Sequence, residues 1–91
     1  MLQIVISNTC KKELERAKKR GLDRDEFFAV VDMLQRQEVL PARYRDHALT
    51  ADRAGLRDCH IRPDWVLIYE VREAELVLLL AETGSHSDLR M

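Results

Sequence analysis

Three histidines in the second half of the chain, His47, His60 and His86, are its best candidates for proton transfer. A histidine side chain titrates at about pH 6.5, so near neutrality it can both give and take a proton. Cleavage of RNA by its own 2′-hydroxyl needs both acts, because one group removes the hydroxyl proton and another protonates the leaving 5′-oxygen. The three histidines are therefore candidate catalytic residues, and the pattern leaves open which is the base and which is the acid.

The residues around His60 form the most specific group of candidate functional residues in the sequence. Asp64 follows four positions later and could orient a histidine or only cap a turn. Trp65, the sole tryptophan, suits either core packing or stacking on a nucleobase. Arg57 and Arg62 flank His60, and their guanidinium groups are candidates for contact with a phosphate.

The histidines also have less specific interpretations. Three histidines in a chain of 91 residues are often polar surface groups or hydrogen-bonded core groups. A three-histidine metal site is formally possible, but the spacing of these residues matches no metal-binding helix or hairpin motif. The sequence therefore predicts neither a metal site nor a cofactor.

The charged residues are unevenly distributed along the chain. Its net charge of −1 is less basic than is usual for a nucleic-acid-binding domain. One basic cluster lies between residues 11 and 20, and a group of arginines lies between residues 43 and 62. Local basic faces can thus exist on a nearly neutral molecule, although the first cluster would also suit a solvated helix face.

A cytoplasmic location is expected from what the sequence lacks. No apolar run approaches the roughly 20 residues of a membrane-spanning helix. Residues 1–6 lack the basic region and the cleavage site of a signal peptide. Cys10 and Cys59 form no C-x-x-C pair and no zinc pattern with the histidines, which favours free, partly buried thiols.

The first half of the chain predicts one strand and two helices, which must help to position these residues. A strand is expected over residues 2–6, followed by N-cap oxygens in residues 7–9 and a helix that stops at Gly21. Asp23 and Glu26 have the spacing of a capping box that opens the second helix. The apolar stripes of the two helices are Cys10, Leu14 and Ala17, and then Phe27, Val30, Val31 and Leu34.

The second half predicts neighbouring strands. Residues 43–54 are polar and aperiodic, which indicates a long loop. Strands are expected over residues 56–61, 65–71 and 76–83. This order predicts one α+β domain over residues 1–91, a small antiparallel β-sheet with two N-terminal helices packed on one face. The opposite face would be open, and RNA would lie across it.

Three segments of the second half carry a family resemblance. Residues 44–49 read Y-R-D-H-A-L, residues 55–69 read G-L-R-D-C-H-I-R-P-D-W-V-L-I-Y, and residues 82–89 read E-T-G-S-H-S-D-L. These segments resemble the YafQ branch of the RelE superfamily of type II toxins. Its pattern is roughly D-H-x-L, then G-x-R-D-x-H-x-x-P-D-W-x-L-I-Y, then T-G-S/T-H-x-x-L.

The resemblance implies a RelE/YafQ-like microbial RNase fold and a ribosome-dependent endoribonuclease that needs no metal ion. Toxins of this family cut messenger RNA in the ribosomal A site and are silenced by a cognate antitoxin protein. Carried over by position, the active residues would be His47, His60, Asp64, Trp65 and His86.

One position departs from the family pattern. The family has an aromatic residue just before its C-terminus, and here Arg90 stands in that place. Its guanidinium group could stack on a base or bind phosphate, so Arg90 is a further candidate for substrate binding. Two alternatives remain on the sequence alone: a non-catalytic ParE-like toxin of the same architecture, and a protein-interaction module. Neither would need the histidines.

Overall fold

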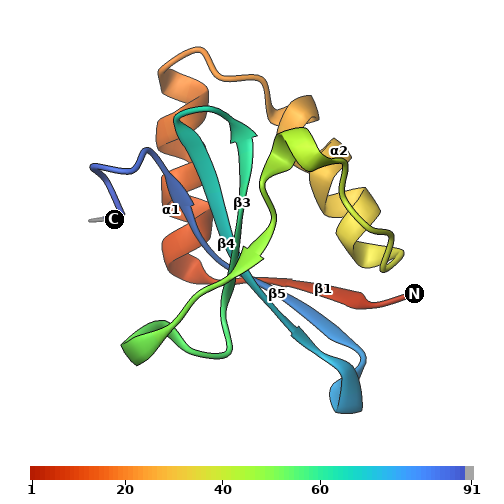
Figure 1. Cartoon of the computed structure of the whole chain (residues 1–91). Coiled ribbons are helices and arrows are strands. Elements are labelled where there is room, and N and C mark those ends of the chain that lie inside the picture. Colours follow the sequence, from red (N-terminus) through yellow and green to blue (C-terminus); the bar gives the residue numbers. More distant parts are fainter. Residues whose placement is uncertain (90–91) are drawn as a thin grey trace.

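The computed structural model describes residues 1–89, so Arg90 lies outside the described residues. Two helices follow the first strand, and the remaining strands come after them (Figure 1). The helices and strands are β1 (Gln3–Ile6), α1 (Asn8–Lys19), α2 (Arg24–Gln35), β2 (His47–Ala48), β3 (Arg57–Arg62), β4 (Trp65–Arg72) and β5 (Val77–Gly84). Short 3-10 turns are η1 (Ala42–Tyr44), η2 (Ala51–Arg53) and η3 (Glu73–Glu75).

The five strands form one mixed sheet in the order β1-β5-β4-β3-β2. β1 runs parallel to β5, whereas the other three pairings are antiparallel. The α+β class is confirmed, but the sheet is not wholly antiparallel as predicted. A hairpin forces its two strands to be antiparallel, and no hairpin joins β1 to β5 because both helices and three strands lie between them.

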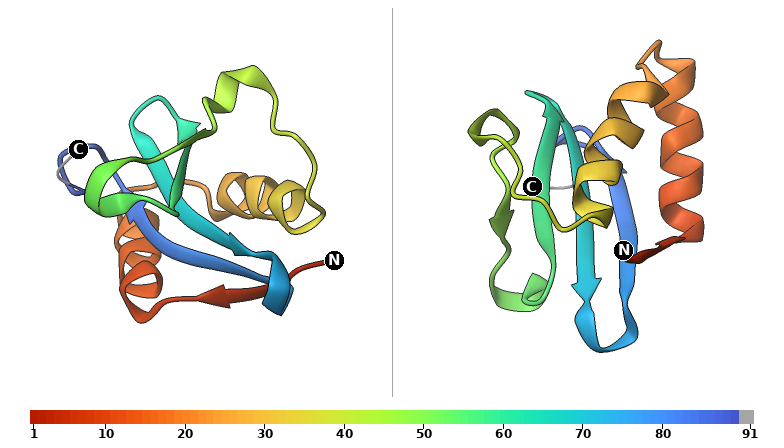
Figure 2. Two further views of the ribbon diagram at one scale, coloured as in Figure 1. Left: turned by 60° about the horizontal axis from the view of Figure 1, so that its bottom comes forward. Right: turned by 90° about the vertical axis from the view of Figure 1, so that its right-hand side faces the viewer.

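Both helices pack against the same face of the sheet, as predicted (Figure 2, right). All seven residues of the two predicted apolar stripes are buried in this core. The Ser7 hydroxyl accepts a hydrogen bond from the Cys10 amide and caps α1, and Asp23 caps α2. Glu26 does not complete a capping box, because its carboxylate binds Arg62 instead. Within residues 1–89, no helix is long and apolar enough to cross a membrane.

The opposite face of the sheet is not open as predicted. Val66 and Ile68 of β4 are fully buried there, under Leu49, Leu56 and Leu89. The segment over residues 43–54 is not a plain loop either, since it contains β2, the edge strand beside β3. A strand of two residues is too short to show any alternation, so apolar periodicity could not reveal it.

Candidate active site

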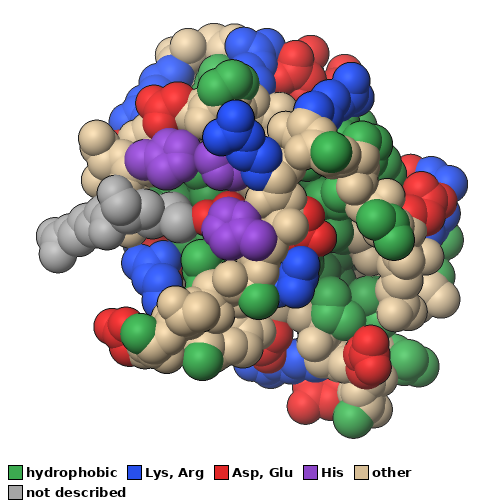
Figure 3. Space-filling model, in the orientation of Figure 1, with side chains coloured by type: hydrophobic (Ala, Val, Ile, Leu, Met, Phe, Trp, Pro, Cys, Tyr) green, Lys and Arg blue, Asp and Glu red, His purple; other side chains and the backbone are tan. Residues whose placement is uncertain are grey.

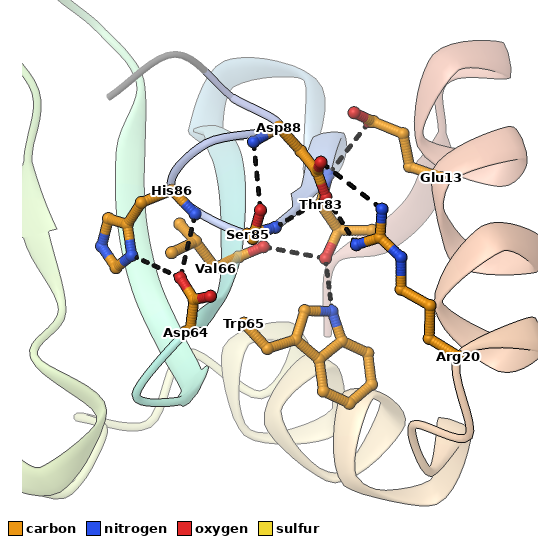
Figure 4. A network of polar contacts seen from close by, with 9 residues as sticks. All are labelled: Glu13, Arg20, Asp64, Trp65, Val66, Thr83, Ser85, His86 and Asp88. Carbon is orange, nitrogen blue, oxygen red and sulfur yellow. Dashed lines mark hydrogen bonds and ion pairs between the residues drawn. The ribbon is translucent and has the colours of Figure 1, made fainter.

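His60, His86 and Asp64 meet at the end of the sheet where β3 and β5 finish and β4 begins. Residue Val66 of β4 pairs with Gly84 of β5, which brings the turn before β4 beside the residues after β5. The ring centroids of His60 and His86 are 5.0 Å apart. Asp64 Oδ1 lies 3.0 Å from His86 Nδ1 and accepts the His86 backbone amide at 3.2 Å (Figure 4).

The contact with Asp64 determines how His86 can act. Its Nδ1 faces a carboxylate, so the proton on that nitrogen is donated to Asp64 and Nε2 is left for proton exchange. The hydrogen bond from the ring, and after it the one from the backbone amide, lower the pKa of Asp64. Asp64 is therefore a stable anion, and it fits the predicted role of orienting a histidine.

His47 reaches the same region from the edge strand β2. Its Nδ1 lies 2.7 Å from the Arg45 carbonyl oxygen, so this nitrogen donates and Nε2 remains available for proton exchange. Its side chain is 53% exposed, enough to meet a substrate. Figure 3 shows histidine side chains gathered on one face of the molecule, with basic and acidic side chains around them.

Asp58 joins His47 to His60, a role that sequence reasoning missed. The β2–β3 register sets Asp58 opposite His47, and strand alternation puts it on the same face as His60. Asp58 Oδ1 lies 3.6 Å from His47 Nδ1 and 3.7 Å from His60 Nε2. This oxygen is buried and has no hydrogen-bond partner within residues 1–89. A buried carboxylate oxygen of this kind is costly, so its place between two imidazole rings needs an explanation.

The tail that carries His86 is held by a clamp formed by Arg20 and Asp88 (Figure 4). Arg20, the C-cap residue of α1, binds the Asp88 carboxylate at 2.7 Å, and that carboxylate accepts the Ser85 amide at 3.1 Å. A Cβ on Gly84 would stand 3.0 Å from the Asp88 Cβ, so glycine lets this turn close. The turn fixes the residues on both sides of His86.

Trp65 is not a stacking surface, which corrects its predicted contact with substrate. The residue is 1% exposed, and its ring stacks on Phe27 with centroids 6.1 Å apart. Its indole N–H donates to the Thr83 hydroxyl at 2.9 Å (Figure 4). An indole held by core packing and by a hydrogen bond cannot present a face to a nucleobase.

The two predicted phosphate ligands have different surroundings. Arg57 is not beside the histidines, because alternation turns it to the face opposite His60. Its Nε lies 3.3 Å from both Asp46 and the Tyr69 hydroxyl, which anchors the residue before His47. This geometry corrects the prediction for Arg57. Arg62 lies near His60 in sequence and space, and its guanidinium group binds Glu26 at 2.6 and 2.8 Å.

The cysteines take no part in the site. Cys10 and Cys59 are free and fully buried, and burial is the main cause that raises the pKa of each thiol to about 12. Within residues 1–89, no group of three or more His, Cys, Asp or Glu side chains has the arrangement to hold a metal ion.

Comparison with known proteins places this geometry among characterised relatives. A family model described as "Bacterial toxin of type II toxin-antitoxin system, YafQ" matches residues 2–91. The mRNA interferase toxin YafQ of Escherichia coli strain K12 is 34% identical over 87 residues, covering 94% of this chain and 92% of that protein.

Solved structures agree over nearly the whole chain. The E. coli DinJ–YafQ complex has a matching chain with a TM-score of 0.88 and 33% identity, with 98% of each chain covered. A metal-bound toxin from Helicobacter pylori has a TM-score of 0.93 and 36% identity, covering 98% of this chain and 99% of that one.

Proposed function

Since the chain belongs to the YafQ family of type II toxins and is an endoribonuclease of the mRNA interferase class, we propose that His47, His60 and His86 carry the cleavage. The substrate is messenger RNA in the ribosomal A site, and no metal ion takes part. The observation that carries this proposal is the convergence of the three histidines around Asp58 and Asp64.

The histidines have different surroundings, which suggests a division of labour. His47 and His86 each donate through Nδ1 to an oxygen and keep Nε2 for proton exchange, so one acts as base and the other as acid. The two ring nitrogens of His60 face the Pro63 carbonyl and Asp58. With the base and the acid assigned to the other two histidines, His60 stabilises the charge that builds on the phosphate.

Single substitutions test the three histidines. We expect His47→Ala and His86→Ala each to slow cleavage on programmed ribosomes by about 10²–10⁴-fold while the proteins stay folded. The products should carry a 5′-hydroxyl and a 2′,3′-cyclic or 3′-phosphate. Wild-type growth arrest by all three single histidine variants would refute the proposed site.

A modified substrate identifies the acid. A 5′-bridging sulfur at the cleaved bond leaves without being protonated, so it no longer needs a general acid. The variant that lacks the acid should therefore recover activity on this substrate, whereas the variant that lacks the base should not. Assays with and without a chelator test metal independence, and cleavage that requires an added divalent ion would contradict it.

We also propose that a cognate antitoxin binds and silences the protein in the cytosol. The support is the E. coli relative, whose structure is a DinJ–YafQ toxin-antitoxin complex. Co-expression of the neighbouring short reading frame, followed by pull-down, tests this. The frame should encode a partner that restores growth. Unhindered cleavage of messenger RNA on ribosomes in its presence would contradict the idea.

A further inference from the structure

A cavity of 520 Å³ lies beside His60, between α2, η1 and the turn from β3 to β4. Its volume falls within the range of about 300–1,000 Å³ that is common for sites of small ligands. The lining residues that bear charge or an aromatic ring are Glu26, Arg43, Tyr44, Arg45, His60 and Arg62.

The cavity wall carries uncompensated positive charge. Glu26 is its one acidic lining residue within residues 1–89, and two hydrogen bonds from Arg62 neutralise it. Within that same range, neither Arg43 nor Arg45 forms an ion pair with an acidic side chain, and both side chains lie at exposed positions. Two such guanidinium groups on one wall suit a phosphate, which they can bind with paired N–H donors.

Tyr44, which lies between these two arginines in the sequence, brings an aromatic ring to the cavity. Tyr44 is half-buried, and the Arg43 guanidinium group lies 4.8 Å from its ring centroid. Arg43 also donates to the Tyr44 hydroxyl at 2.8 Å, so the ring and the cation are held together. Aromatic rings and guanidinium planes are the surfaces on which unpaired bases stack.

The cavity is joined to the catalytic histidines on two sides. His60 lines it and stands 5.0 Å from His86. Arg45 has a left-handed backbone with φ of 49°, and its carbonyl oxygen accepts the Nδ1 proton of His47. An RNA strand whose scissile phosphate lies among the histidines therefore has a neighbouring nucleotide at this cavity.

We propose that the cavity is a subsite for one nucleotide next to the scissile phosphate. Tyr44 stacks on its base, and Arg43 and Arg45 bind its phosphate. This subsite deepens the RNA cleavage proposed above and rests on it. An acidic antitoxin segment would also satisfy two arginines, but the aromatic wall and the continuity with the histidines favour RNA.

Single-turnover cleavage on programmed ribosomes tests the subsite, because it separates the toxin concentration at half-saturation from the rate at saturation. Tyr44→Leu should raise the half-saturating concentration about tenfold or more and leave the saturated rate nearly unchanged. Tyr44→Phe keeps the ring and should behave like the wild type. Arg45→Ala should resemble Tyr44→Leu. The matched control is Arg72→Ala, which removes an exposed arginine at the far end of β4.

A message with 4-thiouridine at each position around the cut locates the nucleotide directly. One position should cross-link to the peptide that contains Tyr44. The subsite would be overturned if the Tyr44 and Arg45 variants saturate like Arg72→Ala, or if they lose affinity only for the antitoxin. The proposed function would still stand in that case, provided that the wild type cuts the message and His86→Ala does not. A wild-type protein that cuts no message would instead defeat the proposed function itself.

Discussion

At the scale of single residues, Asp58 is the buried acid of the candidate site. Its buried Oδ1 has two histidine rings nearby but no hydrogen bond within residues 1–89. A buried carboxylate is costly unless a positive charge accompanies it. We therefore infer that Asp58 acts on the two neighbouring histidine rings.

Asp58→Asn tests this balance. The variant should be as stable as the wild type or more so, because it no longer buries a carboxylate oxygen without a hydrogen bond. Cleavage should nevertheless fall by about tenfold or more, because the carboxylate that lies beside the rings of His47 and His60 is gone. Thermal unfolding and the saturated cleavage rate measure the two effects. A variant with lower stability and full activity would show that Asp58 is only structural.

A substitution at Trp65 tests whether this residue stabilises the fold or contacts the substrate. Trp65→Phe removes the indole N–H that reaches Thr83, and it leaves a small gap beside Phe27. We expect a loss of about 1–2 kcal/mol in the free energy of unfolding, measured with urea. The folded variant should still cut RNA at nearly the wild-type rate. A large loss of activity at unchanged stability would place the ring at the substrate after all.

At the scale of elements, the Arg20–Asp88 clamp connects α1 to the tail that bears His86. The hydrogen bond from Arg20, and after it the one from the Ser85 amide, lower the pKa of Asp88 to about 2. Because this pKa lies below the ordinary value, the clamp stabilises the tail above about pH 4. That stabilisation is lost as the pH falls through about 2, so the clamp is closed under assay conditions.

Arg20→Ala should open the clamp with little change in melting temperature, because the pair lies at the surface. Cleavage should fall because His86 is no longer held. Arg36→Ala, which breaks the exposed pair with Asp32, is the control and should keep full activity. Equal activity in the two variants would mean that Asp64 alone orients His86.

The elements also show what the sequence could predict. The strand alternation and helix stripes predicted the main strands and both helices, since each spans enough residues to show a period. β2 has two residues and shows none, yet it brings His47 opposite Asp58. The motif spacing indicated the three histidines as candidate catalytic residues, but the face of the sheet that a side chain occupies depends on strand register. The sequence alone therefore could not separate Arg57, which faces away, from Asp58, which faces the site.

At the scale of the whole molecule, both faces of the sheet carry buried apolar side chains. Helices cover one face, and Leu49, Leu56 and Leu89 cover part of the other. The candidate site lies at one end of the sheet, where β3 and β5 finish, β4 begins and β2 forms the edge. The core and the candidate site therefore occupy different parts of the same strands.

The two cysteines report on that core. Burial is the main cause that raises the pKa of Cys10 and of Cys59 from 9.0 to about 12. Each folded-state pKa lies above the unfolded one, so the stabilisation from both neutral thiols is complete below pH 9 and is lost as the pH rises toward 12.

The native protein should therefore resist a thiol-reactive chromogenic disulfide at neutral pH, because only a thiolate attacks such a reagent and neither sulfur is exposed. The same reagent in denaturant should titrate both thiols. The melting temperature should fall as the pH rises above 9, and the fall should be smaller in Cys59→Ala than in the wild type. Rapid labelling of the native protein would mean that the core opens on the timescale of the reaction, because both thiols are fully buried in the folded state.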